Sequence, residues 1–172
     1  MKRTHSIKVG ISSCLLGNEV RYDGRHSRNK CILDSMSDLM ELLPFCPEVA
    51  IGMSIPRPPI NLVRIEGEIR VRGVHDNTHD VTDALNKYAM SLAEQFEDIS
   101  GYIFKSRSPS CGLDDVDVYD GDTQQVIATS SGQFAKIIAQ QHPSLPIENE
   151  LRLENETIRN DFIKRVQVYS AR

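Results

Sequence analysis

The sequence contains no tryptophan and no Cys-x-x-Cys pair, and none of its apolar runs is long enough to cross a membrane. Without paired cysteines there is no local support for a zinc ribbon or a thioredoxin-type dithiol. The lack of a long apolar run argues against a membrane-spanning helix. Residues Met1–Ser6 also lack the apolar stretch of a signal peptide, so we expect a cytoplasmic protein.

Charge of neither sign dominates the chain. The formal net charge is −4 and the isoelectric point is near 5.7, so we expect neither bulk nucleic-acid binding nor attachment to an anionic membrane. The 172 residues show no repeat, linker or low-complexity tract, and 40% of them are hydrophobic. This composition predicts one globular domain spanning residues 1–172.

Strand and helix patterns alternate along the chain. The segments Lys8–Ser13 and Gly101–Phe104 predict strands. We expect a largely parallel, Rossmann-like α/β sheet with helices on both faces. A small β-hairpin insertion is predicted from Leu62–Glu66 and Glu68–Arg72, and Val116–Tyr119 predicts a further strand. Apolar spacing predicts helices over residues 31–43, 81–96, 131–141 and 154–168.

Three of the four cysteines follow predicted strands. These are Cys14, Cys46 and Cys111. The carboxyl ends of parallel strands meet at one edge of a sheet, so we expect the three thiols to converge there. Cys31 lies at the start of a predicted helix and is interpreted as a structural residue. Disulfide bonds are not expected in a cytosolic chain.

The turn after the strand Gly101–Phe104 combines hydroxyls, a thiol and two cations. In one interpretation the backbone N–H groups of Ser108–Gly112 form an anion-holding concavity, and Lys105 and Arg107 lower the pKa of Cys111. The alternative is a solvated turn with an incidental cysteine. This segment alone does not separate the two interpretations.

A second unusual stretch is Pro44–Val49. Its two prolines predict an extended segment rather than a helix, on which Cys46 and Glu48 point to the same side. A metal ligand and a proton donor could then share one cavity, although an exposed glutamate beside a buried cysteine remains the alternative. Arg57 lies in a proline-rich loop, so it loses little freedom on contacting a ligand.

Three thiolates without a fourth partner suit an iron–sulfur cluster better than a closed zinc site. A tetrahedral zinc would need Cys31 or a histidine as its fourth ligand. A [4Fe-4S] cluster held by three cysteines keeps one open iron, which is a Lewis acid with high affinity for sulfur.

Five motifs together resemble the TudS-like thiouracil desulfidase family, formerly listed as a domain of unknown function. The resemblance extends from about Val9 to about Tyr119. Longer relatives append a second domain and act on thiolated RNA bases, whereas this chain is expected to be the standalone single-domain form. The five motifs are Ser12–Gly17, Arg21–Gly24, Phe45–Glu48, Pro56–Arg57 and Phe104–Gly112.

The resemblance implies a [4Fe-4S] cluster bound by Cys14, Cys46 and Cys111, with one open iron. It implies non-redox removal of sulfur from a thiolated pyrimidine, which is thiouracil-like and either a base or a nucleotide. The products are uracil and sulfide. Glu48 matches the acid/base residue of the family, and Ser108 matches the serine of its turn. The residues expected to bind substrate are Ser13, Asp23, Arg57, Lys105 and Ser110.

Two alternatives stay open. One is a zinc-stabilised or metal-free module for nucleotides or RNA, with Arg25–Lys30 and the turn at Lys105 and Arg107 as its phosphate site. The other is a thiol-based sulfur-transfer protein in which Cys111 is the reactive group. The visible spectrum and metal content of anaerobically purified protein would separate these alternatives from the cluster enzyme.

Overall fold

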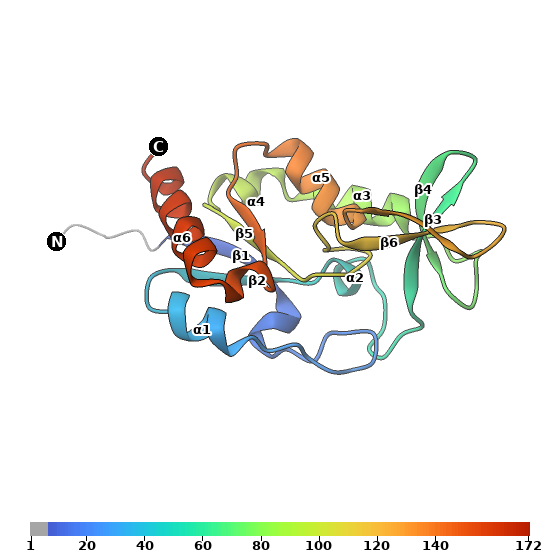
Figure 1. The fold of residues 1–172 in the computed structure, drawn as a ribbon, viewed down its shortest axis with the longest axis horizontal. Helices are drawn as coiled ribbons and strands as arrows, with labels where there is room; N and C mark the ends of the chain where they lie inside the picture. Colours follow the sequence, from blue (N-terminus) through green and yellow to red (C-terminus); the bar gives the residue numbers. More distant parts are fainter. Residues whose placement is uncertain (1–6) are drawn as a thin grey trace.

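The computed structural model describes residues 7–172; Met1–Ser6, for which no signal peptide is predicted, lies outside the described residues. One of its two four-stranded sheets is entirely parallel, with strand order β2-β1-β5-β8 (Figure 1). This sheet confirms the predicted α/β class. Its strands are β1 (Lys8–Ser12), β2 (Glu41–Phe45), β5 (Tyr102–Phe104) and β8 (Ile147–Asn149).

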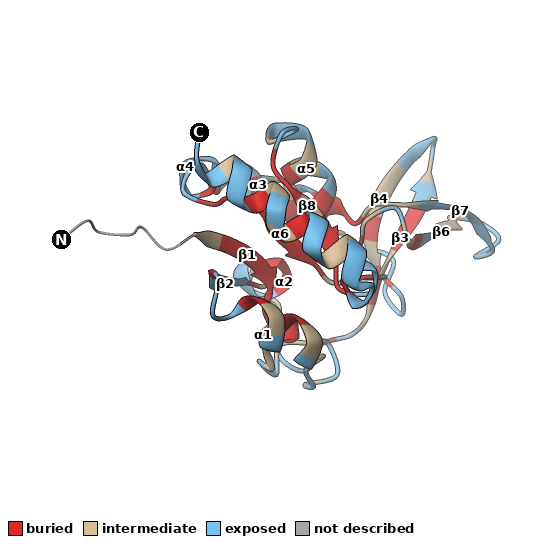
Figure 2. Ribbon diagram, turned by 60° about the vertical axis from the view of Figure 1, so that its left-hand side comes forward, coloured by how far each residue is buried: buried red, intermediate tan, exposed pale blue. Residues whose placement is uncertain are grey.

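Helices cover both faces of the parallel sheet, because its strands alternate their side chains between two apolar cores. Ile103 packs with the core under α1 (Lys30–Met36) and α6 (Glu156–Ser170). Its neighbours in β5, Tyr102 and Phe104, point to the opposite core. That core contains side chains of α3 (Thr82–Ser91), α4 (Ala93–Glu97) and α5 (Gln133–Gln141). Figure 2 shows the buried stripes on these helices.

The predicted hairpin is part of a second sheet, with strand order β4-β3-β6-β7. The hairpin strands are β3 (Ile60–Ile65) and β4 (Glu68–Gly73), and β6 (Val116–Asp120) lies parallel to β3. The edge strand β7 (Val126–Ser130) was not predicted, because its mostly exposed side chains show no alternation. Within residues 7–172 no helix combines the length and apolarity that crossing a membrane requires.

Three sequence-based boundaries are wrong. The helix predicted over residues 31–43 ends at Met36, and Glu41–Phe45 forms the edge strand β2, where a proline is tolerated. The stretch predicted to be extended through Val49 instead forms the short helix α2 (Pro47–Ala50). Proline favours the first helical turn, where its missing N–H costs nothing. Leu92 also interrupts the helix predicted over 81–96, separating α3 from α4.

Candidate functional site

A cavity of about 310 Å³ lies at the carboxyl ends of the parallel strands, and three cysteines line it. Cys14 lies in the 3₁₀ turn η1 (Ser13–Leu16) directly after β1, and Cys46 joins β2 to α2. Cys111 lies in the turn that follows β5. Because β1 is flanked by β2 and β5 in one parallel sheet, these positions meet at the same edge. Glu48 lines the same cavity.

Burial keeps the cavity thiols protonated in the metal-free protein. It raises the pKa of Cys14 from the ordinary 9.0 to about 11, against a smaller opposing effect of Lys105. Burial also raises the pKa of Cys46, and it raises that of Cys111 well above the ordinary value. The expectation that nearby cations lower the pKa of Cys111 is therefore wrong, since loss of solvent dominates.

The donor chemistry of the cavity fits an iron–sulfur cluster, because three thiols line it. Among residues 7–172, no three His, Cys, Asp or Glu side chains are placed to hold one metal ion. Cluster thiolates bind different irons, so they need not converge on a single point. Metal ligation removes the thiol protons, and the three neutral thiols thereby gain a partner for their charged form.

The Glu48 carboxylate is held by two donors. Arg57 Nε donates to its Oε2 at 2.7 Å, and Ser110 Oγ donates to its Oε1 at 2.8 Å. Arg57 Nη2 also donates to the Val20 carbonyl at 2.9 Å. The side chains of Arg57 and Glu48 are only 4% and 12% exposed, so their ion pair is shielded from water. Arg57 lines the cavity, but its guanidinium is already engaged with Glu48.

The turn that carries Cys111 is closed by its own serine. Ser108 Oγ accepts from the backbone N–H groups of Ser110 at 3.3 Å and Cys111 at 3.1 Å. The Ser108 carbonyl accepts from Gly112 N at 2.8 Å. The expected anion-holding concavity is therefore wrong, because these N–H groups are paired within the turn.

The first turn of α5 fixes the same loop from outside. Gln133 N donates to the Pro109 carbonyl at 2.9 Å, and Ala135 N donates to the Ser110 carbonyl at 3.0 Å. Gly132 makes this approach possible, since a Cβ there would lie 2.7 Å from the Cys111 nitrogen. Helix and turn thus set the direction of Cys111 together.

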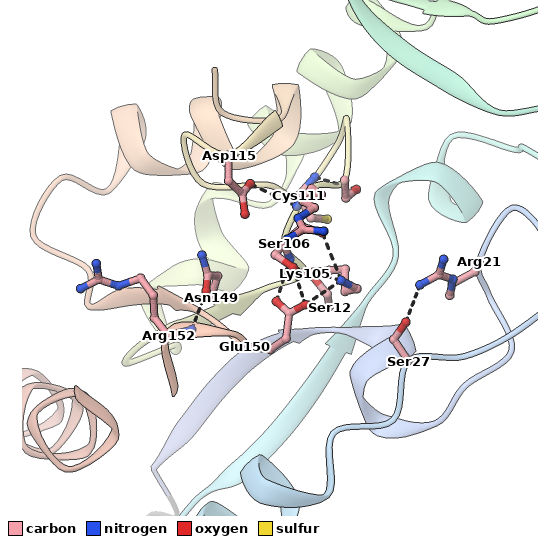
Figure 3. Close-up of polar contacts among 12 residues, drawn as sticks. Ser12, Arg21, Ser27, Lys105, Ser106, Cys111, Asp115, Asn149, Glu150 and Arg152 are labelled. Atoms are coloured by element: carbon pink, nitrogen blue, oxygen red, sulfur yellow. Dashed lines mark hydrogen bonds and ion pairs between the residues drawn. The ribbon is translucent and has the colours of Figure 1, made fainter. Parts of the chain in front are cut away.

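A carboxylate that sequence reasoning did not select anchors the start of the turn. Glu150 follows β8, and its side chain is 5% exposed. It accepts from Lys105 Nζ at 2.6 Å, from Ser106 N at 2.7 Å and from Ser106 Oγ at 2.6 Å (Figure 3). Because β8 pairs with β5, Glu150 lies beside Ser106 and Lys105, which precede it in the sequence by 44 and 45 positions. No local pattern in the sequence pointed to Glu150, because its place in the site depends on the pairing of β8 with β5.

A family model of 2-thiouracil desulfurases matches residues 9–150. The chain belongs to the 2-thiouracil desulfurase family. The uncharacterized protein YbbK of Bacillus subtilis (strain 168) is 33% identical to this desulfurase-family chain over 147 residues, covering 82% of the chain and 95% of YbbK. The solved structure of the [4Fe-4S]-dependent thiouracil desulfidase TudS is similar, with TM-score 0.69 and 28% identity over 90% of this chain and 98% of TudS. The predicted family and fold class are confirmed.

Some of the remaining expected site residues of this desulfurase-family chain line the cavity, and others do not. Ser13 and Lys105 line it, and Ser13 Oγ accepts from Asn18 Nδ2 at 2.8 Å. Asp23 does not line the cavity. Its carboxylate instead accepts a hydrogen bond from the Arg25 backbone N–H at 3.0 Å. Cys31 lies outside it on α1. Wall residues that sequence reasoning did not select include Ser12, Arg21, Tyr22, Phe45 and Ser106.

Proposed function

We propose that this chain, with residues 1–172 as one desulfidase-like domain, removes sulfur from a small thiolated pyrimidine by hydrolysis at a [4Fe-4S] cluster. The observation that carries the proposal is the meeting of Cys14, Cys46, Cys111 and the buried Glu48 in one cavity. Its similarity to the [4Fe-4S]-dependent desulfidase TudS supports the same chemistry. The reaction exchanges C=S for C=O, consumes water and releases hydrogen sulfide, so no electrons are transferred overall.

Cys14, Cys46 and Cys111 would hold three of the four irons. The bound cluster would supply a Lewis-acidic iron that takes the sulfur of the substrate and polarises the C=S carbon. Each buried thiol releases its proton on ligation, so cluster assembly is favoured by rising pH.

Glu48 is the acid/base residue in this proposal. Each of its oxygens accepts one hydrogen bond from the protein, which leaves each oxygen a further acceptor site. The carboxylate takes a proton from the attacking water and returns it to the departing sulfur. Arg57 and Ser110 hold it in one orientation during this transfer. A positioned acid/base group contributes roughly 10²–10⁴-fold to the rate.

The rest of the wall provides binding groups. Ser108 Oγ accepts two backbone N–H groups, so its single proton can be donated to a substrate atom. Ser13 and Lys105 lie at the wall, and the Ser13 hydroxyl, which accepts from Asn18, keeps its proton for a polar edge of the base. The apolar part of the wall, against which the pyrimidine ring can pack, comes from Phe45, Pro47 and Tyr22.

Iron content and sulfide release test the proposal. Protein reconstituted anaerobically with iron and sulfide should bind about four irons per chain and release sulfide from thiouracil. Glu48→Gln should keep the iron and lose roughly 10²–10⁴-fold in turnover, whereas the control Glu68→Gln, on the exposed hairpin, should match the wild type. A colourless protein with stoichiometric zinc, or normal turnover in Glu48→Gln, would contradict it.

The thiol-based alternative has less support from the site. A reactive cysteine needs an accessible thiolate, whereas Cys111 is 5% exposed and burial raises its pKa. Slow alkylation of Cys111 in the metal-free protein is therefore expected.

A further inference from the structure

A tyrosine hydroxyl buried in the core has no hydrogen-bond partner. Tyr102 in β5 is fully buried, and its Oη is one of only three buried side-chain N or O atoms in the described part of the chain without a partner. Buried polar groups are hydrogen-bonded as a rule, so this exception needs a reason. Phenylalanine would fill the same apolar space without leaving a hydroxyl unpaired.

Packing fixes the direction of this hydroxyl. The Tyr102 ring lies against Phe104, with centroids 4.2 Å apart, and against Phe45 and Phe96 at 5.7 and 5.8 Å. On the side of β1 it occupies the space above Gly10, where a Cβ would lie 2.4 Å from its Cδ2. The ring is therefore enclosed on several sides, and its hydroxyl cannot swing away to find another partner.

Ser12 lies on the same face of the sheet as the Tyr102 ring and at the wall of the cysteine cavity. It ends β1, lines the cavity and is 3% exposed. Its Oγ accepts from Lys105 N at 2.9 Å (Figure 3). Gly10 of β1 pairs with Tyr102 of β5, so Ser12 is the next residue of β1 on the face that carries the Tyr102 ring, and it lines the same cavity as Cys111.

The hydrogen-bonding capacity of a serine matches these neighbours. A hydroxyl has one proton to donate and two lone pairs. The Lys105 N–H uses one lone pair, which leaves the second for the Tyr102 hydroxyl and the proton for the Cys111 sulfur. A neutral thiol accepts hydrogen bonds weakly, whereas a thiolate accepts them strongly. The arrangement thus becomes favourable once Cys111 is charged.

We propose that Tyr102 and Ser12 form a hydroxyl relay that orients the Cys111 thiolate, with Tyr102 donating to Ser12 and Ser12 donating to Cys111 Sγ. Both are positioning residues, and the inference rests on the proposed function because ligation of the cluster is what keeps Cys111 charged. Donors behind a ligand hold its geometry, and hydrogen bonds to cluster sulfurs tune the reduction potential.

Three variants test the relay: Tyr102→Phe, Ser12→Ala and their combination, with Tyr169→Phe on α6 as the matched control. Metal-free Tyr102→Phe should melt at or above the wild-type temperature, since it loses only an unpaired hydroxyl. After anaerobic reconstitution it should release iron to a chelator roughly 10-fold faster than wild type. Its reduction potential should shift to more negative values, because a donor to sulfur stabilises the more negative, reduced cluster.

The combined variant separates a relay from two independent effects. Tyr102 acts through Ser12, so Tyr102→Phe/Ser12→Ala should release iron no faster than Ser12→Ala alone. The relay is overturned if Tyr102→Phe behaves like Tyr169→Phe in iron release and potential, or if the two effects multiply. A wild-type protein that binds no iron would overturn the proposed function and this inference together, whereas iron binding with an unchanged Tyr102→Phe would overturn the relay alone.

Discussion

Replacing Arg57 by methionine removes the cation that holds the Glu48 carboxylate and keeps a side chain of similar length. The guanidinium lies 2.7 Å from Glu48 Oε2, and the two side chains are only 4% and 12% exposed. Water cannot replace the lost partner at such a site, so Glu48 would remain charged and unpaired in the interior. Arg57→Met should therefore destabilise the protein far more than removal of a surface charge.

The structure allows the size of this effect to be worked out. Removing one partner of a buried ion pair costs about 3–5 kcal/mol. The Val20 carbonyl also loses its donor at 2.9 Å, which adds about 1 kcal/mol. The sum of about 4–6 kcal/mol is a large part of the roughly 5–15 kcal/mol that stabilises a typical domain. For a chain of this length it lowers the melting temperature by roughly 8–24 °C.

Urea unfolding of the metal-free variants, followed by circular dichroism, measures the effect. Arg64→Met, which removes an exposed arginine from β3, is the matched control and should change stability by less than about 0.5 kcal/mol. The double variant Arg57→Met/Glu48→Gln should be more stable than Arg57→Met alone, because no buried charge remains unpaired. Simple addition of the two single effects would refute the reasoning.

Three further perturbations follow from other contacts. Ser110→Ala removes the donor to Glu48 Oε1 and should lower kcat roughly tenfold at unchanged iron content; unchanged kcat would contradict this. Because burial raises the pKa of Cys14 from 9.0 to about 11, the unfolded chain ionises first, and the metal-free protein should lose stability as the pH rises from 9 to 11. Melting curves of Cys14→Ser should show a smaller loss, and an equal loss would count against the assignment. Asp80→Ala removes the acceptor of Arg70 at 2.9 Å and should cost about 2 kcal/mol in urea unfolding; wild-type stability would show that this pair contributes little.

The meeting of the three cysteines could be expected from the sequence because parallel strands place their carboxyl ends at one edge. Cys14 and Cys46 each follow within two residues of a strand end, so neither position depends on long loops. Cys111 is farther from its strand, but proline and glycine in its turn favour a tight return of the chain. Local patterns and one topological rule were sufficient for Cys14 and Cys111, whereas most of the strand before Cys46 was predicted as a helix.

Other features depended on information that local patterns do not contain. Apolar residues before Pro44 fit a helical period as well as a strand, and pairing with β1 decides in favour of the strand. The position of Glu150 in the site depends on the pairing of β8 with β5, two strands that are far apart in the sequence. The pKa of Cys111 depends on complete burial, whereas its neighbours in sequence suggested the opposite direction.

Contacts within the chain order the residues around the cavity, which leads to a prediction about metal removal. Ser108 closes the cysteine turn, Glu150 fixes Lys105, and Arg57 holds Glu48, all through contacts within the chain. The apolar cores lie on both faces of the parallel sheet and under the second sheet.

Chelation under anaerobic conditions should therefore remove the visible absorption and the activity while the far-ultraviolet circular dichroism and cooperative unfolding persist. This behaviour differs from that of small zinc domains, whose folding free energy is supplied by metal binding. Reloading with iron and sulfide should restore activity without refolding. Loss of cooperative unfolding on chelation would show that the contacts of Ser108, Glu150 and Arg57 are too weak to order the site, because ligation would then be what assembles it.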